Sequence, residues 1–278
     1  MKITFYGQCT FLIEAGGVRI VTDPYLTDSI DRGQPEGSPW HRAFPAPVTL
    51  DELKPDVILI SHAHGDHFDR ETLKPYYAAD GAAALYVPEP VVPFAAKLGL
   101  QARPANADRA IQVGDVTITP VACAHQKLHQ DDDGHFFELS YMIEHEGKKV
   151  FFGGDMSLYD GLTEKLAAMA PDVMLIPVNG ADYYRTASHC IGNTNCIEAA
   201  KLAKAVGVKY YIPTHHDVYY PYRLSLVGSE MCIRDRIMHI LPCLCAIWRS
   251  RSHFTRRFLA LQRRSHSRMK MVTHGLSM

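Results

Sequence analysis

The chain has 278 residues, of which 47% are hydrophobic, and its formal net charge is −1. This composition can bury the core of one or two globular domains. No apolar segment reaches the roughly 20 residues that cross a bilayer, and the start of the chain lacks a signal-peptide pattern, so we expect a cytoplasmic protein without a membrane anchor.

The first part of the chain predicts three strands, a long loop, and then a strand followed by a helix. Strands are expected over residues 2–6, 10–15 and 18–22, with Gly16 and Gly17 as a hairpin turn. A loop rich in Pro and Gly spans residues 31–47, and loops of this length are often functional. A buried strand over 56–60 leads to a short helix over 70–77.

The remainder alternates strands with helices. Strands are expected over residues 84–87, 116–122, 136–144, 149–152, 173–177 and 209–212. Helices are expected over residues 91–98, 162–169 and 195–206, the last with apolar residues at helical spacing. We find no internal repeat at the periods typical of solenoid proteins.

The strand over 56–60 leads directly into a turn rich in histidine. His62, His64, Asp66 and His67 fall within six residues, so one turn could hold two metal ions side by side. Neutral imidazole and carboxylate bind Zn²⁺ and Mn²⁺ well, and sites without thiolate are more often catalytic than structural. A merely solvated turn is the alternative, and this spacing after a buried strand makes it much the weaker one.

The same run resembles the His-x-His-x-Asp-His signature of the metallo-β-lactamase superfamily. The resemblance implies an α/β fold, the four-layer αββα sandwich with two sheets face to face and helices outside. It also implies that later ligands follow strand ends. His125 follows the strand over 116–122, Asp155 lies in a Gly-Gly-Asp turn, and His215 follows the strand over 209–212.

The family pattern assigns these side chains to two metal ions. It implies a first metal held by His62, His64 and His125, a second held by Asp66, His67 and His215, and Asp155 bridging both. His216 is an alternative to His215, and His129 and His135 are weaker alternatives to His125. Asp23 would orient a ligand imidazole through its free ring N–H, unless it is a plain turn residue before Pro24.

The expected chemistry is hydrolysis. Two divalent ions, Zn²⁺ or Mn²⁺, about 3.5–4 Å apart lower the pKa of a shared water, so that a bridging hydroxide attacks a carbonyl or phosphorus at neutral pH. Asp66, or a metal-bound water, would pass a proton to the leaving group. The oxygen-reducing diiron branch of the superfamily usually has Glu at the position of His64, so redox chemistry is disfavoured.

Three segments indicate the substrate. Residues 178–186, 191–195 and 213–217 resemble the L-ascorbate-6-phosphate lactonase branch, which opens a sugar-acid lactone, commonly with manganese. The resemblance implies that Arg185 and Tyr184 meet a phosphate or carboxylate of a small-molecule substrate. A solvated arginine in an exposed loop is the alternative. The chain departs from the branch in starting at its first strand, and Gln8 replaces a histidine common in related small hydrolases.

Other functions of the same fold remain open. Up to residue 223 the chain carries 19 basic and 28 acidic side chains, a net charge of −9 that would repel a polyanion, so we expect no nucleic-acid partner and disfavour a nuclease or phosphodiesterase. A thioester hydrolase of glyoxalase II type would use the same metals. A non-catalytic metal-binding protein is the third alternative, and the sequence leaves homo-oligomer formation open.

Composition changes abruptly near residue 223, and we divide the chain there into a hydrolase domain, 1–223, and a tail, 224–278. The tail carries 10 basic and 2 acidic side chains. Residues 226–235 read as the translation of a DNA adapter of the transposon-derived type used in sequencing libraries. We therefore expect the tail to be non-native and the natural C-terminal end to be missing.

The chain has seven cysteines, an odd number without paired zinc-ribbon spacing. Reduced thiols in a reducing compartment are the simplest interpretation. We expect four of them to be small packing residues: Cys9, Cys123, Cys190 and Cys196.

Overall fold

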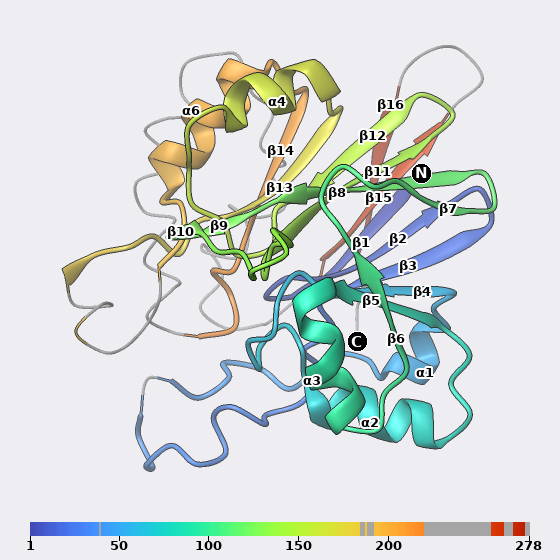
Figure 1. The fold of residues 1–278 in the computed structure, drawn as a ribbon, viewed down its shortest axis with the longest axis vertical. Coiled ribbons are helices and arrows are strands. Elements are labelled where there is room, and N and C mark those ends of the chain that lie inside the picture. Colours follow the sequence, from blue (N-terminus) through green and yellow to red (C-terminus); the bar gives the residue numbers. More distant parts are fainter. Residues whose placement is uncertain (39, 184–186, 188–191, 220–256, 264–268, 276–278) are drawn as a thin grey trace.

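A computed structural model describes residues 1–38, 40–183, 187, 192–219, 257–263 and 269–275 (Figure 1). Its main body consists of two six-stranded sheets and the helices that cover them. The lactonase-branch residues Tyr184 and Arg185 and the predicted domain boundary lie outside the described residues.

The first sheet uses its six strands in chain order, β1 to β6. β1, β2 and β3 pair antiparallel through tight turns, whereas β3, β4, β5 and β6 run parallel. The strands are β1 (Lys2–Gly7), β2 (Thr10–Ala15), β3 (Val18–Thr22), β4 (Val57–Leu59), β5 (Ala84–Pro88) and β6 (Ala102–Ala105).

The second sheet has the order β14-β13-β12-β11-β8-β7. Its parallel part is β12, β13 and β14, and antiparallel pairing continues through β11, β8 and β7. The strands are β7 (Ile111–Val113), β8 (Val116–Ala122), β11 (Leu139–His145), β12 (Lys148–Phe152), β13 (Val173–Pro177) and β14 (Tyr210–Thr214). A two-stranded sheet pairs β9 (Ala124–His125) with β10 (Lys127–Leu128).

Helices cover the outer face of each sheet. In Figure 1, α2 and α3 lie on one side of the molecule and α4 and α6 on the opposite side. The helices are α1 (Leu50–Leu53), α2 (Arg70–Ala78), the 3₁₀ turn η1 (Glu89–Val91), α3 (Val92–Lys97), α4 (Leu162–Met169) and α6 (Cys196–Val206).

Alternation along the strands divides the core into three layers. Successive side chains of a strand point to opposite faces. Val57 and Leu59 therefore join the cluster between the sheets, whereas Ile58 packs under the α1–α3 helices. Met174 likewise packs under α4 and α6. One apolar layer between the sheets and one under each helical layer make the αββα sandwich that the sequence predicted.

The predicted elements within the described residues are present, with small shifts at their ends. The strand expected over 136–144 begins only at Leu139, and the one expected from residue 209 runs from Tyr210 to Thr214. Several short elements were not predicted: α1, β6, β7, β9 and β10. Cys9, Cys123 and Cys196 are free and buried, as expected, and Cys190 lies outside the described residues.

Within 224–278 the structure describes two strands, β15 (Arg257–Arg263) and β16 (Met269–Gly275), which pair antiparallel. The sequence predicted neither, and the non-native origin of this segment stays a prediction. Among the described helices, none has the length and apolar character needed to cross a membrane.

Candidate metal centre

The predicted ligands meet at one edge of the sandwich, where strands from both sheets end. His62 to His67 follow β4, His125 lies in β9 just after β8, Asp155 follows β12, and His215 follows β14. Carboxyl ends of parallel strands share an edge, so residues distant in the chain converge there. The assembly therefore depends on both sheets.

The histidine turn is fixed by the helix that follows it. Asp69 caps α2, since its side chain accepts a hydrogen bond from the Glu71 backbone N–H. The same carboxylate accepts hydrogen bonds from the hydroxyls of Thr27 and Ser29. Phe68 is fully buried under the helices. The turn between β4 and α2 is thus held at its far end by a cap and a core residue.

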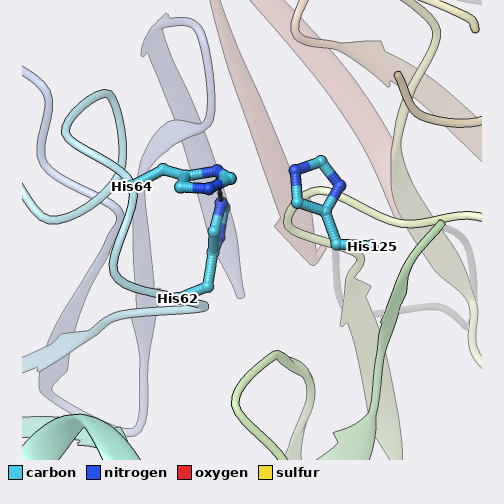
Figure 2. Close-up of side chains that lie close together, drawn as sticks. All are labelled: His62, His64 and His125. Atoms are coloured by element: carbon cyan, nitrogen blue, oxygen red, sulfur yellow. Dashed lines mark hydrogen bonds between the residues drawn. The ribbon is translucent and has the colours of Figure 1, made fainter. Parts of the chain in front are cut away.

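Three imidazoles form the first group. The ring nitrogens of His62, His64 and His125 include one from each residue, all within 4.8 Å of one another. In Figure 2, His62 and His64 come from one segment and His125 faces them from another. His62 Nε2 lies 2.9 Å from His64 Nδ1. His62 is buried and His64 is exposed, so this group opens toward solvent.

The second group is more deeply buried and contains carboxylates. Asp66, His67 and His215 each place one ligand atom within 4.8 Å of the others. His215 Nε2 lies 3.2 Å from Asp66 Oδ2 and 3.3 Å from Asp155 Oδ1. His67 Nε2 lies 3.8 Å and 3.3 Å from the same two oxygens. Four ligand atoms therefore surround one point: Asp66 Oδ2, Asp155 Oδ1, His67 Nε2 and His215 Nε2.

Asp155 lies between the two groups. Its Oδ1 faces His67 and His215, whereas its Oδ2 is 3.8 Å from His125 Nε2. The Gly-Gly turn before it permits this approach. Gly154 has a φ of +62°, and a Cβ there would lie 2.6 Å from the Cβ of Ser61. No larger residue could bring the end of β12 so close to the histidine turn.

The Asp23 carboxylate lies against the buried His67 ring. Its Oδ2 lies 2.7 Å from His67 Nδ1 and accepts a hydrogen bond from the Ser61 hydroxyl at 2.6 Å. Its Oδ1 accepts from the Ser61 backbone N–H at 2.7 Å. A carboxylate on Nδ1 directs the other ring nitrogen, Nε2, into the second group.

Electrostatics differ between the two groups. Burial lowers the pKa of His62 and of His125, so both rings are neutral and have a free lone pair. Burial alone would lower the pKa of His67 as well, but Asp155, Asp66 and Asp23 raise it. The first group therefore consists of neutral imidazoles, whereas the second group places charged side chains close together.

The carboxylates of the second group are ionised. Burial would raise the pKa of Asp66, but His67 and a hydrogen bond with His215 outweigh burial and hold it well below its usual range. For Asp155 burial would also raise the pKa, but His215 and His67 outweigh burial and hold it well below its usual range. Ionised carboxylates beside imidazoles are a donor set suited to a divalent cation.

Two features show that cations fit this donor set. His67 Nε2 and Asp155 Oδ1 are buried and, within the described part of the chain, make no hydrogen bond. Buried polar atoms normally have partners, and a bound cation would supply one to each of these two atoms. Ligand atoms about 2.1 Å from a tetrahedral cation lie about 3.4 Å apart, and the contacts around the second point measure 3.2 to 3.8 Å.

The alternative histidines lie elsewhere. His216 is buried but belongs to none of the metal-competent groups of the described residues. His129 stacks on Phe137, and His135 groups instead with Asp131 and Asp133 on an outlying turn. His215 and His125 are therefore the histidines that the fold brings to the site.

Some residues of the site were not recognised from sequence. Ser61 links Asp23 to the His62 ring, whose Nδ1 lies 2.9 Å from the hydroxyl. Gln8 contacts Asp66 and His215 directly. Cys9 Sγ lies within 4.8 Å of ligand atoms of His67 and Asp155. Burial raises the pKa of the Cys9 thiol, so it stays protonated and packs in the core between the sheets. The sequence signal for Gln8 was that it replaces a histidine common in related small hydrolases.

The long loop predicted over 31–47 packs against the segment that follows His215. Arg42 forms an isolated bridge with Tyr219, and the Ala43 N–H donates to the Val218 carbonyl at 2.8 Å. The Tyr25 and Tyr219 hydroxyls lie 2.7 Å apart. The loop therefore supports one wall of the second group.

Comparison with known protein families matches the part of the chain that contains all the proposed ligands. A family model described as beta-lactamase superfamily domain matches residues 2–215, which include every proposed ligand. The chain belongs to the metallo-β-lactamase superfamily. This confirms the resemblance to the superfamily and the predicted fold class, whereas the resemblance to the L-ascorbate-6-phosphate lactonase branch stays a prediction.

Similar proteins have been named in several organisms. This superfamily member is 26% identical over 223 residues to a "UPF0173 metal-dependent hydrolase" of Archaeoglobus fulgidus, covering 79% of this chain and 84% of the relative. A protein of the same name in Flavobacterium johnsoniae is 29% identical over 204 residues, covering 73% and 82%. The structure of Igni18, a metallo hydrolase from Ignicoccus hospitalis, superposes with a TM-score of 0.62 at 19% identity, covering 86% and 94%. That likeness concerns the fold.

Proposed function

We propose that this protein is a metal-dependent hydrolase with two divalent cations, Zn²⁺ or Mn²⁺, that cleaves a small ester or lactone. The observation that carries the proposal is Asp155, whose two oxygens face two separate groups of ligand atoms. The family and the names of its relatives support the same class of reaction.

We assign the first cation to His62, His64 and His125, and the second to Asp66, His67 and His215, with Asp155 shared. When bound, such a pair supplies an activated water and stabilises negative charge on the substrate oxygen. Asp23 holds His67 so that its Nε2 faces the second cation. Asp66 is partly accessible, and in this proposal it relays a proton to the leaving group.

Substrate enters from the side of His64 and Asp66, the more exposed ligands. Tyr184 and Arg185 remain our proposed contacts for a phosphate or carboxylate group on the substrate, with a sugar-acid lactone as the leading candidate. A phosphodiester or a thioester is the alternative substrate, and the acidic charge of residues 1–223 disfavours long polyanions.

Metal content and turnover test this proposal together. We expect about two Zn²⁺ or Mn²⁺ per chain by elemental analysis, and hydrolysis of a small lactone in preference to a phosphodiester or a thioester. Asp66→Ala and Asp155→Ala should each lower kcat/KM at least 100-fold, because each removes a charged ligand. Asp133→Ala is the matched control, since Asp133 is exposed on the outlying turn.

A folded chain that binds no metal would contradict the proposal. Two bound metals without turnover of any of the three substrates would instead favour the non-catalytic alternative. Preference for the thioester or the phosphodiester would keep the hydrolase and replace the lactone.

A further inference from the structure

Gln8, which replaces a histidine common in related small hydrolases, contacts residues of the second group. It is fully buried on the turn between β1 and β2, with a φ of +54°. Its backbone N–H donates to Asp217 Oδ1 at 2.9 Å, and its carbonyl accepts from the His215 N–H at 3.1 Å. These bonds fix a backbone conformation that is uncommon for a residue with a side chain, and they link Gln8 to the strand end that carries His215.

The side-chain amide of Gln8 contacts two proposed ligands at once. Its Nε2 lies 2.8 Å from Asp66 Oδ2 and 2.9 Å from His215 Nε2. Those atoms are 3.2 Å apart, so the amide occupies the third corner of a small triangle. Ligand atoms at right angles around a cation about 2.1 Å away lie about 3.0 Å apart. The amide is therefore at the spacing of a neighbouring ligand in a five-coordinate shell.

The other end of the amide has no partner. Gln8 Oε1 is buried and, among the described residues, makes no hydrogen bond. Without a cation the N–H end must face the Asp66 carboxylate, because an amide oxygen there would be repelled. A cation between these groups reverses that preference, since the oxygen then gains a positive partner. Rotation about the last torsion of a glutamine side chain follows a broad, two-fold profile and costs little.

We propose that Gln8 is an additional ligand of the second cation, which it binds through Oε1 after its amide turns over. The inference rests on the proposed two-metal site and adds an amide oxygen to a shell of imidazoles and carboxylates. Amide and carboxylate oxygens suit Mn²⁺ better than they suit Zn²⁺, which binds imidazole well. Gln8 therefore shifts the selectivity of the second site toward Mn²⁺.

Metal titration of the metal-depleted full-length chain tests this role without measuring activity. The dissociation constants of the first and second equivalents of Mn²⁺ and of Zn²⁺ are measured against a competing chelator in wild type, Gln8→Met and Gln8→Glu. Methionine keeps the length of the side chain and removes both polar amide atoms. Glutamate keeps an oxygen and has no N–H to donate to Asp66.

We expect Gln8→Met to weaken the second equivalent of Mn²⁺ on the order of tenfold or more, and that of Zn²⁺ clearly less. Gln8→Glu should bind the second equivalent at least as tightly as wild type. The first equivalent should change less than about twofold in both variants, which reports an intact fold. If Gln8→Met does not fold, the affinity of Gln8→Glu for the second equivalent, compared with that of wild type, still tests whether Gln8 is a ligand.

Four results would overturn the inference. Equal losses for Mn²⁺ and Zn²⁺ in Gln8→Met would make Gln8 a residue that only positions Asp66. Weaker binding of the second equivalent in Gln8→Glu would show that Gln8 is not a ligand of the second cation. Unchanged binding in both variants, with two metals bound to wild type, would show the same. Either result would leave the proposed function intact. A wild-type chain that binds one equivalent or none would overturn both.

Discussion

Three residues of the candidate metal centre have a backbone conformation that is uncommon for residues with a side chain. Gln8, Asp23 and His215 have φ values of +54°, +36° and +58°, in a region that side chains make uncommon. Each such residue costs on the order of 1–3 kcal/mol and persists only where its surroundings hold it. Here the Gln8 and His215 backbones bond each other, and the Thr10 hydroxyl donates to the Asp23 carbonyl. These conformations place Gln8 and His215 beside Asp66 and place Asp23 against the Nδ1 atom of His67.

Asp23 is the residue whose removal should harm both stability and metal binding. Asp23→Ala leaves His67 Nδ1 and the Ser61 N–H buried without their acceptor. We expect a loss of about 3 kcal/mol in the free energy of unfolding, and a 10- to 100-fold weaker second metal. Denaturant unfolding and chelator competition measure the two effects.

Asp23→Asn provides the matched comparison, because it keeps a carbonyl oxygen at nearly the same place. It should lose clearly less than Asp23→Ala in both assays. If Asp23→Ala bound the second metal as tightly as wild type, Asp23 would be an ordinary turn residue, the alternative that the sequence left open.

Glu138 makes stability depend on pH away from the metals. Burial raises the pKa of Glu138 from 4.5 to about 7, and its Oε2 finds no hydrogen-bond partner in the described structure. The folded state therefore holds a proton that the unfolded state releases, so stability falls as pH rises from about 4.5 to 7. Glu138→Gln should lose less stability than wild type between pH 5 and pH 8 in urea unfolding. Equal losses in the two proteins would refute this account.

At the scale of elements, long periodic segments were predictable and short edge segments were not. β6 contains Pro104, whose missing N–H is tolerated because an edge strand pairs on one side. β7, β9 and β10 span two or three residues, too few for an alternating pattern. Such strands are defined by the neighbours they pair with, which the local sequence does not contain.

The N-terminus of α6 offers a test at this scale. The Asn195 side chain accepts from the N–H groups of Ile197 and Glu198, and Glu198 Oε2 accepts from the Asn195 N–H. Asn195→Ala removes this capping box and should cost about 1 kcal/mol in chemical denaturation. Asn195→Asp keeps the acceptor and should lose little. A loss as large in Asn195→Asp as in Asn195→Ala would mean that capping is not what Asn195 contributes.

For the whole molecule, the metal centre joins the two sheets. Its ligands come from the ends of β4 in the first sheet and of β12 and β14 in the second, so cations would cross-link both halves of the sandwich. An ion that binds the folded state alone stabilises it by about 2.7 kcal/mol at 100 times its dissociation constant.

Metal removal should therefore lower the melting temperature. We expect chelation to reduce Tm by about 5–10 °C in differential scanning calorimetry, and added Mn²⁺ or Zn²⁺ to restore it. The double variant Asp66→Ala with Asp155→Ala should show a clearly smaller shift, because its second site lacks both carboxylates while His62, His64 and His125 remain. An unchanged Tm on chelation of a metal-loaded sample would show that the ions do not join the sheets.

The sequence by itself determined which chemistry is available and where strands end. The imidazoles and carboxylates follow apolar segments, and both the side-chain types and these segments can be read from the local sequence. The family pattern could therefore assign His62 to His67 and the later proposed ligands. Only the tertiary structure decided how close these groups come. It distinguishes His215 from the adjacent His216 and brings Gln8 of the first sheet against His215 of the second, although the two residues lie 207 positions apart. Strand pairing and turn strain act over such separations, and no local pattern records them.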